Sequence, residues 1–373
     1  MRIRRFANQN QVVQQNSYKQ FKRWRQERVR KLKTKDYSYQ VPNVEPDVRF
    51  LRDNTELPSI TWIGHSTFLI QIAGLNIITD PVWAGQMAFQ KRLAPPGIPI
   101  EEVPPIDAVL ISHSHYDHLN ISSLRRLSGP KQMLVPAGLS TKLRLKGFSR
   151  VKELHWWESA RIGGATFTFV PSQHWTRRNP WDTNSSHWGG WVIEAGGESA
   201  KPAKTSELAR SNEPAMPHRS EARDYEMESG MREIAAAYAP SEDFGKNGCS
   251  VRPLVCAEPT VYFAGDSGYF AGFKEIGKRF DIDVALMPIG AYEPEWFMGP
   301  QHVTPEEALQ AFEDTGAKLF VPMHYGAFKL ADDTPLEALE RLEAERCRRR
   351  LEEERIVVLP HGETWKLAGE EQD

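Results

Sequence analysis

From residue 58 onward the chain alternates between short apolar runs and polar turns, a pattern typical of β-strands that bury one or both faces. The region begins with "SITWIGHSTFLIQIAGLNIITDP", in which the pair Ala73-Gly74 predicts a hairpin between the last two strands. Later apolar runs predict buried strands at 106–112, 132–136, 165–171, 190–195, 260–265, 284–290, 318–323 and 355–360. The pattern therefore indicates a strand-rich domain.

Helices are expected between several of these strands. Helical patterns cover residues 120–128 and 138–146. Two later helices carry the same start signal, "TPEE" at 304–307 and "TPLE" at 334–337, in which Thr can cap the helix and Glu can reach back to the cap. Strands first in a meander and later mixed with helices indicate sheets covered by helices, an α/β (α+β) fold.

Residues 1–50 form a strongly basic extension that differs from the rest of the chain. Aromatic, basic and aliphatic residues recur in it near helical spacing, at Tyr18, Phe21, Trp24, Arg28 and Leu32. A helix here could lay its aromatic edge on the main domain. Alternatively, residues 18–35 could contact an anionic membrane peripherally.

Residues 196–258 interrupt the strand pattern. They are polar, rich in Ser, Glu, Ala and Pro, and they lack either hydrophobic period. A segment of this composition cannot bury enough apolar surface to fold. We therefore expect a main domain at 51–373 that carries a disordered insertion at about 196–258.

Composition and charge narrow the class of protein. The chain has 373 residues and a net charge of −2, so we expect no nucleic-acid partner. Its three cysteines are widely separated and lie outside any Cys-x-x-Cys pattern, which argues against a disulfide framework and a thiolate metal site. The sequence has no signal peptide and no apolar run of about 18 residues. These features predict a cytoplasmic protein, peripheral at a membrane if the basic extension binds there, and they are compatible with an oligomer.

Potential metal ligands follow four of the predicted strands. They are His113, His115, Asp117 and His118 after 106–112, His174 after 165–171, Asp266 after 260–265, and His324 after 318–323. Strand ends can converge at one edge of a sheet, so donors far apart in sequence can meet in space. Imidazole nitrogens and carboxylate oxygens suit Zn²⁺, with Mn²⁺ or Fe²⁺ as alternatives.

The spacing within "HSHYDH" supports this interpretation. A strand-like His-x-His pair points both imidazoles the same way, and a turn can aim the following Asp-His pair at a second position. Six or seven donors are too many for one four-coordinate ion, whereas two ions that share a bridging carboxylate would use them. The pattern therefore predicts a site for two divalent ions.

The motifs "SHSHYDHL", "FAGDSGY" and "VPMHYG" resemble the metal-binding motifs of the metallo-β-lactamase superfamily. The resemblance implies an αββα sandwich of two mixed sheets flanked by helices, and a zinc-dependent hydrolase. It implies a first metal at His113, His115 and His174, a second at Asp117, His118 and His324, and a bridging Asp266. A bridging aspartate is typical of the phosphodiesterases, thioesterases and lactonases of this superfamily.

Longer motifs, "TWIGHSTFLIQ", "PSQHWTRRNPWDTNSSHWGGWVI" and "MPIGAYEPEWFMGPQHVTPEEA", resemble the N-acylphosphatidylethanolamine-hydrolysing phospholipase D branch. This implies cleavage of a phospholipid substrate to an N-acylethanolamine and a phosphatidic acid. Tyr116, Gln301 and His302 would contact the substrate, and catalysis would involve Asp117, Asp266 and His302. The alternative is another hydrolase on the same scaffold, such as a sugar-phosphate lactonase or a generic phosphodiesterase.

Two further residues at strand ends could support the site. Asp80 could orient a ligating imidazole through a hydrogen bond. His65 could be structural, could support a ligand, or could bind the metal itself.

Overall fold

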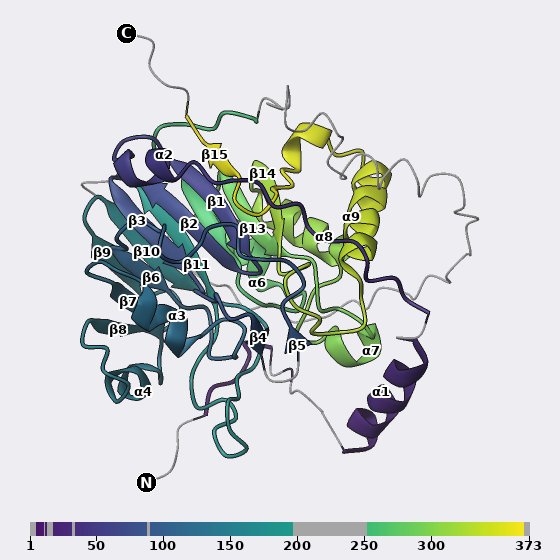
Figure 1. Ribbon diagram of the computed structural model, residues 1–373. Helices are drawn as coiled ribbons and strands as arrows, with labels where there is room; N and C mark the ends of the chain where they lie inside the picture. The colour runs from purple at the N-terminus through teal and green to yellow at the C-terminus, as the bar shows by residue number, and fades with distance from the viewer. Residues whose placement is uncertain are drawn as a thin grey trace, which may run out of the picture. The chain divides into compact units, whose positions relative to one another are not determined.

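A computed structural model describes residues 5–10, 12, 18–31, 34–87, 90–196 and 252–368. Two large β-sheets lie face to face in this part of the chain (Figure 1). The first is seven-stranded and mixed, in the order β15 (Thr364–Lys366), β1 (Ser59–Gly64), β2 (Thr67–Ile72), β3 (Leu75–Thr79), β6 (Ala108–Leu110), β7 (Gln132–Pro136) and β8 (Val151–Leu154). The expected hairpin is confirmed, because β2 and β3 pair antiparallel around Ala73 and Gly74.

The second sheet is six-stranded and also mixed. Its order is β14 (Leu319–Met323), β13 (Val284–Pro288), β12 (Thr260–Phe263), β11 (Gly190–Ala195), β10 (Ala165–Val170) and β9 (Ser159–Ile162). Strands β12, β13 and β14 run parallel, whereas β9 to β12 pair antiparallel. Two short strands, β4 (Gln86–Met87) and β5 (Gln90–Lys91), form a separate ribbon.

Side chains along each strand of the first sheet point alternately to its two faces. The sheet therefore contributes to two apolar cores, one on each face. Trp62 and Phe68 point into the core between the sheets, where they join Phe167 and Trp191 of the second sheet. Their neighbours along the strands, such as Leu69, lie in a second core on the outer face. Successive side chains of a strand point to opposite faces, so a strand buried on both faces reads as a continuous apolar run.

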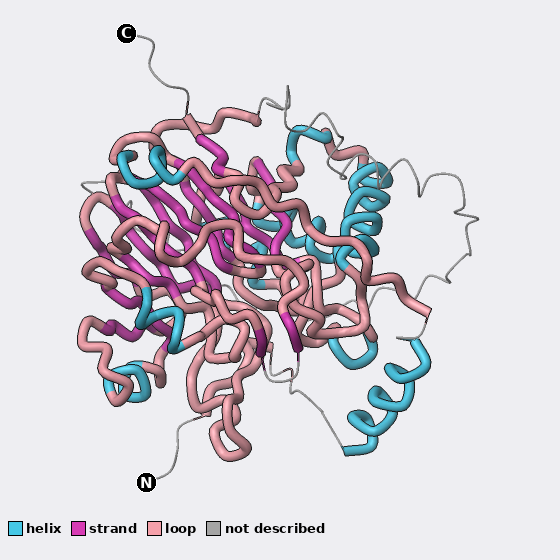
Figure 2. The backbone as a smooth tube through the Cα atoms, in the orientation of Figure 1, coloured by secondary structure: helices cyan, strands magenta, loops and turns pink. Residues whose placement is uncertain are grey.

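Helices cover the outer faces of both sheets (Figure 2). The helices of the described residues are α1 (Tyr18–Lys31), α2 (Val48–Asp53), α3 (Ile121–Arg126), α4 (Ser140–Arg144), α6 (Gly272–Arg279), α7 (Glu295–Met298), α8 (Pro305–Thr315) and α9 (Pro335–Arg349), with a 3₁₀ turn η1 (Glu353–Arg355). Both predicted capping boxes are present, at Thr304 with Glu307 and at Thr334 with Glu337. The αββα sandwich of two mixed sheets is therefore confirmed.

One predicted strand is wrong. Residues 355–360 are apolar enough for a buried strand, but Ile356 makes an isolated bridge with Phe320 at the edge of the second sheet. Beyond this bridge the chain leaves β14 and reaches β15 at the edge of the first sheet. The segment buries Val357 and Leu359 because it connects the two sheets, but it extends neither one.

The N-terminal helix is present as α1, and part of its expected face contacts the main domain. The Trp24 ring stacks on Phe297 of α7 at 5.4 Å, and Arg28 Nη1 lies 3.4 Å from Asp332 Oδ1. The expected insertion at about 196–258 falls mostly outside the described residues. No helix in the described part of the chain has the length and apolarity needed to cross a membrane.

Candidate metal centre

The potential ligands lie together at one end of the sandwich. Each follows the end of a strand: His113 after β6, His174 after β10, Asp266 after β12 and His324 after β14. Contacts between ring nitrogens and carboxylate oxygens connect them across the two sheets. The expected convergence of these side chains is therefore present in the structure.

The first group of donors consists of His113, His115 and His174. Nε2 of His113 lies 2.9 Å from Nδ1 of His115, and Nε2 of His174 lies 3.2 Å from the same atom. The three donor atoms all lie within 4.8 Å of one another, close enough to surround one metal ion.

The second group consists of Asp117, His118 and His324, with His65 beside them. Nε2 of His118 lies 3.3 Å from Nε2 of His324 and 3.4 Å from Asp117 Oδ2. Nε2 of His65 lies 3.2 Å from Asp117 Oδ2, and its ring centroid is 4.1 Å from that of His324. The structure thus adds His65, whose role the sequence left open, to this group.

Asp266 lies between the two groups. Its Oδ2 atom is 3.8 Å from Nε2 of both His113 and His174, and 3.2 Å from Nε2 of His118. Its Oδ1 atom is 3.1 Å from Nε2 of His324. A single carboxylate thus faces donors of both groups, as a bridging ligand must.

The outward hydrogen bonds of the imidazoles show that this donor set suits a cation. His118 Nδ1 donates to Asp80 Oδ2 at 2.7 Å, which confirms the hydrogen bond expected for Asp80, and His174 Nδ1 donates to the Gln301 carbonyl at 2.9 Å. Ser112 Oγ donates to Asp80, so it accepts from His113 Nδ1 at 2.9 Å. Each of these three rings therefore turns its Nε2 atom inward, toward the other donors, where its lone pair is available once that atom carries no proton. Lone pairs gathered in this way repel one another unless a cation lies among them.

The charges of the buried groups also favour metal binding. Burial lowers the pKa of His113 and His174 well below the ordinary value and that of His115 to about 4, so these rings are neutral at pH 7. Burial raises the pKa of Asp117 and Asp266, but the facing His118 and other imidazoles outweigh it and hold both carboxyl pKa values well below the usual range. Neutral imidazoles and ionised carboxylates are the protonation states that bind divalent ions.

The pKa values of His118 and His324 are shifted in the opposite direction, upward. Burial lowers their pKa, but the carboxylates outweigh this effect and raise the pKa of His324 to about 9 and that of His118 well above its ordinary value. The space between Asp117 and Asp266 therefore attracts positive charge, which a proton or a metal ion can supply.

Backbone strain is concentrated around these side chains. Three residues other than glycine have left-handed φ angles here, +58° at His65, +32° at Asp80 and +65° at His324. Conformations of this kind cost on the order of 1–3 kcal/mol each and persist when the surrounding packing enforces them. Gly265, next to Asp266, has φ +63°, and a Cβ there would lie 2.7 Å from the Cβ of Ser112. The turn that directs Asp266 into the site therefore requires glycine.

The three expected substrate contacts lie in different surroundings. His302 is buried beside the donors, with Nδ1 3.9 Å from Asp266 Oδ2. Tyr116 is 54% exposed at the rim and donates from its hydroxyl to the Arg178 carbonyl. The main-chain oxygen of Gln301 holds His174, while its side-chain amide turns toward the Phe297 carbonyl at 3.4 Å. Gln301 thus orients a predicted ligand, which the sequence did not indicate.

Arg178 is a further residue that the sequence did not identify. Its Nη1 atom donates to the carbonyl oxygens of Ser114 at 2.8 Å, Leu119 at 2.9 Å and His115 at 3.3 Å. The guanidinium also lies 4.0 Å from the centre of the Tyr116 ring. It fixes the loop that carries four potential ligands. The pair of arginines in "HWTRRNPW" is visible in the sequence. Nothing near it indicates that Arg178 binds carbonyl oxygens of a distant loop.

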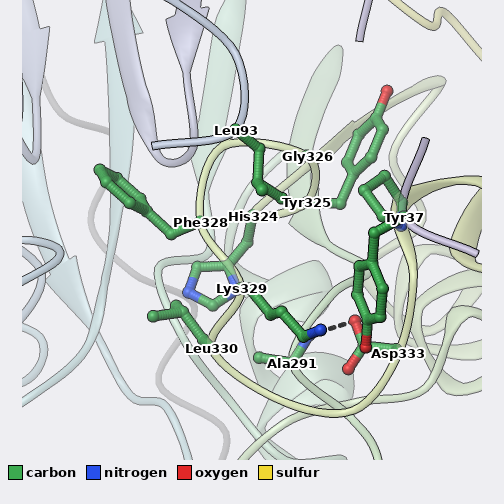
Figure 3. A pocket seen from close by; sticks show the side chains of 11 residues that line it. Tyr37, Leu93, Ala291, His324, Tyr325, Gly326, Phe328, Lys329, Leu330 and Asp333 are labelled. Atoms are coloured by element: carbon green, nitrogen blue, oxygen red, sulfur yellow. Dashed lines mark hydrogen bonds between the residues drawn. The ribbon is translucent and has the colours of Figure 1, made fainter. Parts of the chain in front are cut away.

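A narrow pocket adjoins His324 (Figure 3). Leu93, Phe328 and Leu330 supply apolar atoms, whereas Lys329 and Asp333 supply charged ones. Asp333 accepts from the Ala291 amide at 3.0 Å, the interaction drawn in Figure 3. The surface next to the donors is therefore amphipathic.

Comparisons with known proteins give the chain a family. The beta-lactamase superfamily domain matches residues 75–201 and 248–325. An N-acyl-phosphatidylethanolamine-hydrolyzing phospholipase D of Caenorhabditis elegans is 28% identical over 329 residues, which are 83% of this chain and 75% of that protein. A UPF0173 metal-dependent hydrolase of Methanopyrus kandleri is 27% identical over 82% of this chain and 99% of its own length. The solved metallo hydrolase Igni18 of Ignicoccus hospitalis shares the fold, with a TM-score of 0.52 and 21% identity over 84% of this chain and 99% of its own.

Proposed function

Because the chain belongs to the metallo-β-lactamase superfamily of metal-dependent hydrolases, we propose that it is a dinuclear zinc phosphodiesterase of phospholipase D type. Its substrate would be N-acylphosphatidylethanolamine, and its products an N-acylethanolamine and a phosphatidic acid. The observation that carries the dinuclear assignment is the position of Asp266 between two groups of donors. The substrate class follows from the similarity to the C. elegans phospholipase D.

Each group of donors would hold one ion. His113, His115 and His174 would bind the first, Asp117, His118 and His324 the second, and Asp266 both. Mn²⁺ or Fe²⁺ could replace Zn²⁺ with these nitrogen and oxygen ligands. When bound, the pair would supply an activated water nucleophile and stabilise negative charge on the phosphoryl oxygens.

The protein's own groups would orient the reactants. Burial lowers the pKa of His302 to about 4, so its ring is neutral at pH 7 and can donate one hydrogen bond to a phosphoryl oxygen. Asp117 and Asp266 are ionised and can orient the attacking water through hydrogen bonds. Tyr116 and the 68% exposed Trp181 lie on the loops beside the donors, where their rings can contact the apolar part of a lipid.

The outer face of α1 would contact an anionic membrane. Lys19, Lys22 and Arg25 are exposed there and make no ion pair with any carboxylate of the described residues, and Val29 is 59% exposed on the same side. The opposite side of α1 is held by Glu27, which accepts from Trp296 Nε1 at 3.1 Å. Exposed cations along one helical face suit a surface of anionic lipid.

The decisive experiment compares substrates with the purified, zinc-loaded protein. N-acylphosphatidylethanolamine, a bis-aryl phosphodiester and a sugar-phosphate lactone are supplied separately, and products are identified by mass spectrometry. We expect release of N-acylethanolamine and phosphatidic acid from the lipid. Turnover of the bis-aryl ester or the lactone without turnover of the lipid would instead assign a generic phosphodiesterase or a lactonase.

A further inference from the structure

Residues 5–10, called the N-terminal strap from here on, lie against the loop between β10 and β11. The strap precedes the region that matches the superfamily domain. The Phe6 amide donates to the Asn184 carbonyl at 2.9 Å, and the Phe6 ring stacks on His187 with a centroid distance of 4.5 Å. Main-chain and aromatic contacts together attach the strap to a loop that carries a potential metal ligand.

Asn8 makes the central contacts of the strap. Its Oδ1 atom accepts from the main-chain amide of His174 at 3.1 Å and from Trp188 Nε1 at 2.9 Å. Its Nδ2 atom donates to the Val12 carbonyl at 3.0 Å. Both the nitrogen and the oxygen of the Asn8 side chain are therefore hydrogen-bonded, and the oxygen accepts from two residues of the loop.

The hydrogen bond to Asn8 satisfies the main-chain amide of His174, which has no partner in a neighbouring strand. His174 lies beyond the end of β10, and it is only 2% exposed. A buried main-chain amide that lacks an acceptor costs on the order of 1–3 kcal/mol. Asn8 supplies that acceptor, while the Gln301 carbonyl accepts from the His174 ring. His174 is therefore held at its main chain and at its ring, and its Nε2 atom faces the other donors.

A second asparagine extends this arrangement. Asn10 Nδ2 donates to Gln173 Oε1 at 2.8 Å, and Gln173 Nε2 donates to the Pro300 carbonyl at 3.0 Å. The strap thus contacts both residues of the Gln173-His174 pair, and through Gln173 it reaches the segment that precedes Gln301.

We propose that the N-terminal strap is part of the metal centre and that Asn8 is a positioning residue for His174. This inference rests on the proposed role of His174 as a metal ligand. Hydrogen bonds that fix a ligand's orientation contribute about 10–100-fold to metal affinity. Asn8 acts on His174 alone among the potential ligands of the described chain, so its effect falls on one of the two ions.

The test is a zinc titration of the full-length protein in competition with a chromogenic chelator. We expect Asn8→Ala to bind one ion about 10–100-fold more weakly and the other as in the wild type. Asn8→Asp keeps an oxygen that can accept both hydrogen bonds, so it should restore the affinity. Gln9→Ala is the matched control, because Gln9 is an exposed neighbour in the strap.

The outcomes separate the inference from the proposed function. If Asn8→Ala binds both ions like the wild type, Asn8 has no positioning role, even if the variant melts earlier. A wild-type protein that fails to bind two ions contradicts the proposed function itself. Should Asn8→Ala fold poorly by circular dichroism, Asn8→Gln provides the same comparison, because it keeps the amide but displaces its oxygen.

Discussion

Nδ1 of His118 lies 2.7 Å from Oδ2 of Asp80, and both side chains are completely buried. The carboxylate also accepts from Ser112, at Oδ1 from the main-chain amide and at Oδ2 from the hydroxyl. Asp80 therefore fixes His118 directly and His113 through Ser112. One buried carboxylate thus orients an imidazole in each of the two groups of donors.

The substitution Asp80→Asn should weaken metal binding at both positions. The side-chain amide cannot accept every hydrogen bond that the carboxylate accepts, so His118 or Ser112 would lose its partner. We expect zinc affinity to fall about 10–100-fold, measured by competition with a chelator. Asp107→Asn is a suitable control, since Asp107 also accepts a main-chain hydrogen bond, from Asn76 at 2.9 Å, but lies outside the donor groups. Equal affinities for Asp80→Asn and the wild type would contradict the proposed role of Asp80.

Asp266→Asn should abolish hydrolysis. The amide carries no charge and has a single acceptor oxygen, so it cannot neutralise and join two ions as a carboxylate can. We expect kcat to fall by more than about 100-fold, because a shared ligand matters more than the groups that orient it. The rate is measured with the lipid and with the bis-aryl phosphodiester, after metal content has been determined. A variant that keeps its rate and both ions would show that Asp266 does not bridge.

Arg178→Lys should loosen the loop that carries His113 to His118. The lysine ammonium cannot reproduce the planar guanidinium that reaches three carbonyl oxygens and stacks on Tyr116. We expect a loss of about 1–3 kcal/mol in the free energy of unfolding, followed by chemical denaturation with metal present. Arg177→Lys is the neighbouring control, because Arg177 is exposed and its guanidinium lies over the Trp175 ring, at 5.5 Å from the centroid. If the two variants have the same free energy of unfolding, the contact between Arg178 and the loop does not stabilise the protein.

The protein should lose stability in acid partly through His361. Burial, with help from Arg92, lowers the pKa of this histidine to about 3, whereas the unfolded chain has the ordinary value of 6.5. Below pH 6.5 the unfolded state therefore binds a proton that the folded state does not, so the free energy of unfolding falls between pH 6.5 and about 3. The effect approaches about 1.4 kcal/mol per pH unit for one proton. His361→Asn should reduce the slope of unfolding free energy against pH in this window, and an unchanged slope would rule the contribution out.

Reversing the charge on the outer face of α1 should reduce membrane binding. The triple variant Lys19→Glu, Lys22→Glu and Arg25→Glu removes three cations, each worth about 1 kcal/mol near an anionic surface. Sedimentation with phosphatidylcholine vesicles, with and without phosphatidylserine, measures the effect. We expect the wild type to bind the anionic vesicles in a salt-dependent way and the variant to bind them more than about 10-fold less. Lys152→Glu with Arg161→Glu, exposed on strands β8 and β9, is the control. If both variants bind alike, α1 is not the membrane contact.

The convergence of the potential metal ligands was largely predictable, because these residues stand in a local pattern. A histidine or aspartate that follows an apolar strand within three residues, as Asp266 and His324 do, is visible in the sequence and is placed at the sheet edge by the strand itself. The buried strands were predictable for the same reason, since each is a short apolar run. The resemblance to known motifs then implied the two-sheet sandwich, which periodicity alone could not give.

The residues that hold the donors in place were not predictable, because their partners are distant in sequence. Asn8 and Arg178 reach groups on other segments, and neither lies in a pattern that indicates its partner. The strand predicted at 355–360 was wrong for a related reason. Its composition suits a strand, but pairing depends on a neighbour, and Phe320 offers it one bridge before the chain turns to the other sheet.

The pairing of β11 with β12 has a practical consequence. Glu194 lies opposite Thr260 in this antiparallel pair, although residues 195–259 separate them along the chain. Positions opposite each other in such a ladder are about 5 Å apart, the spacing that a tight hairpin spans. The ends of the intervening segment are therefore already adjacent, at the opposite end of β12 from Asp266. This junction is a natural place to graft a reporter domain, or to splice in a short turn, because it lies at the other end of β12 from the potential metal ligands.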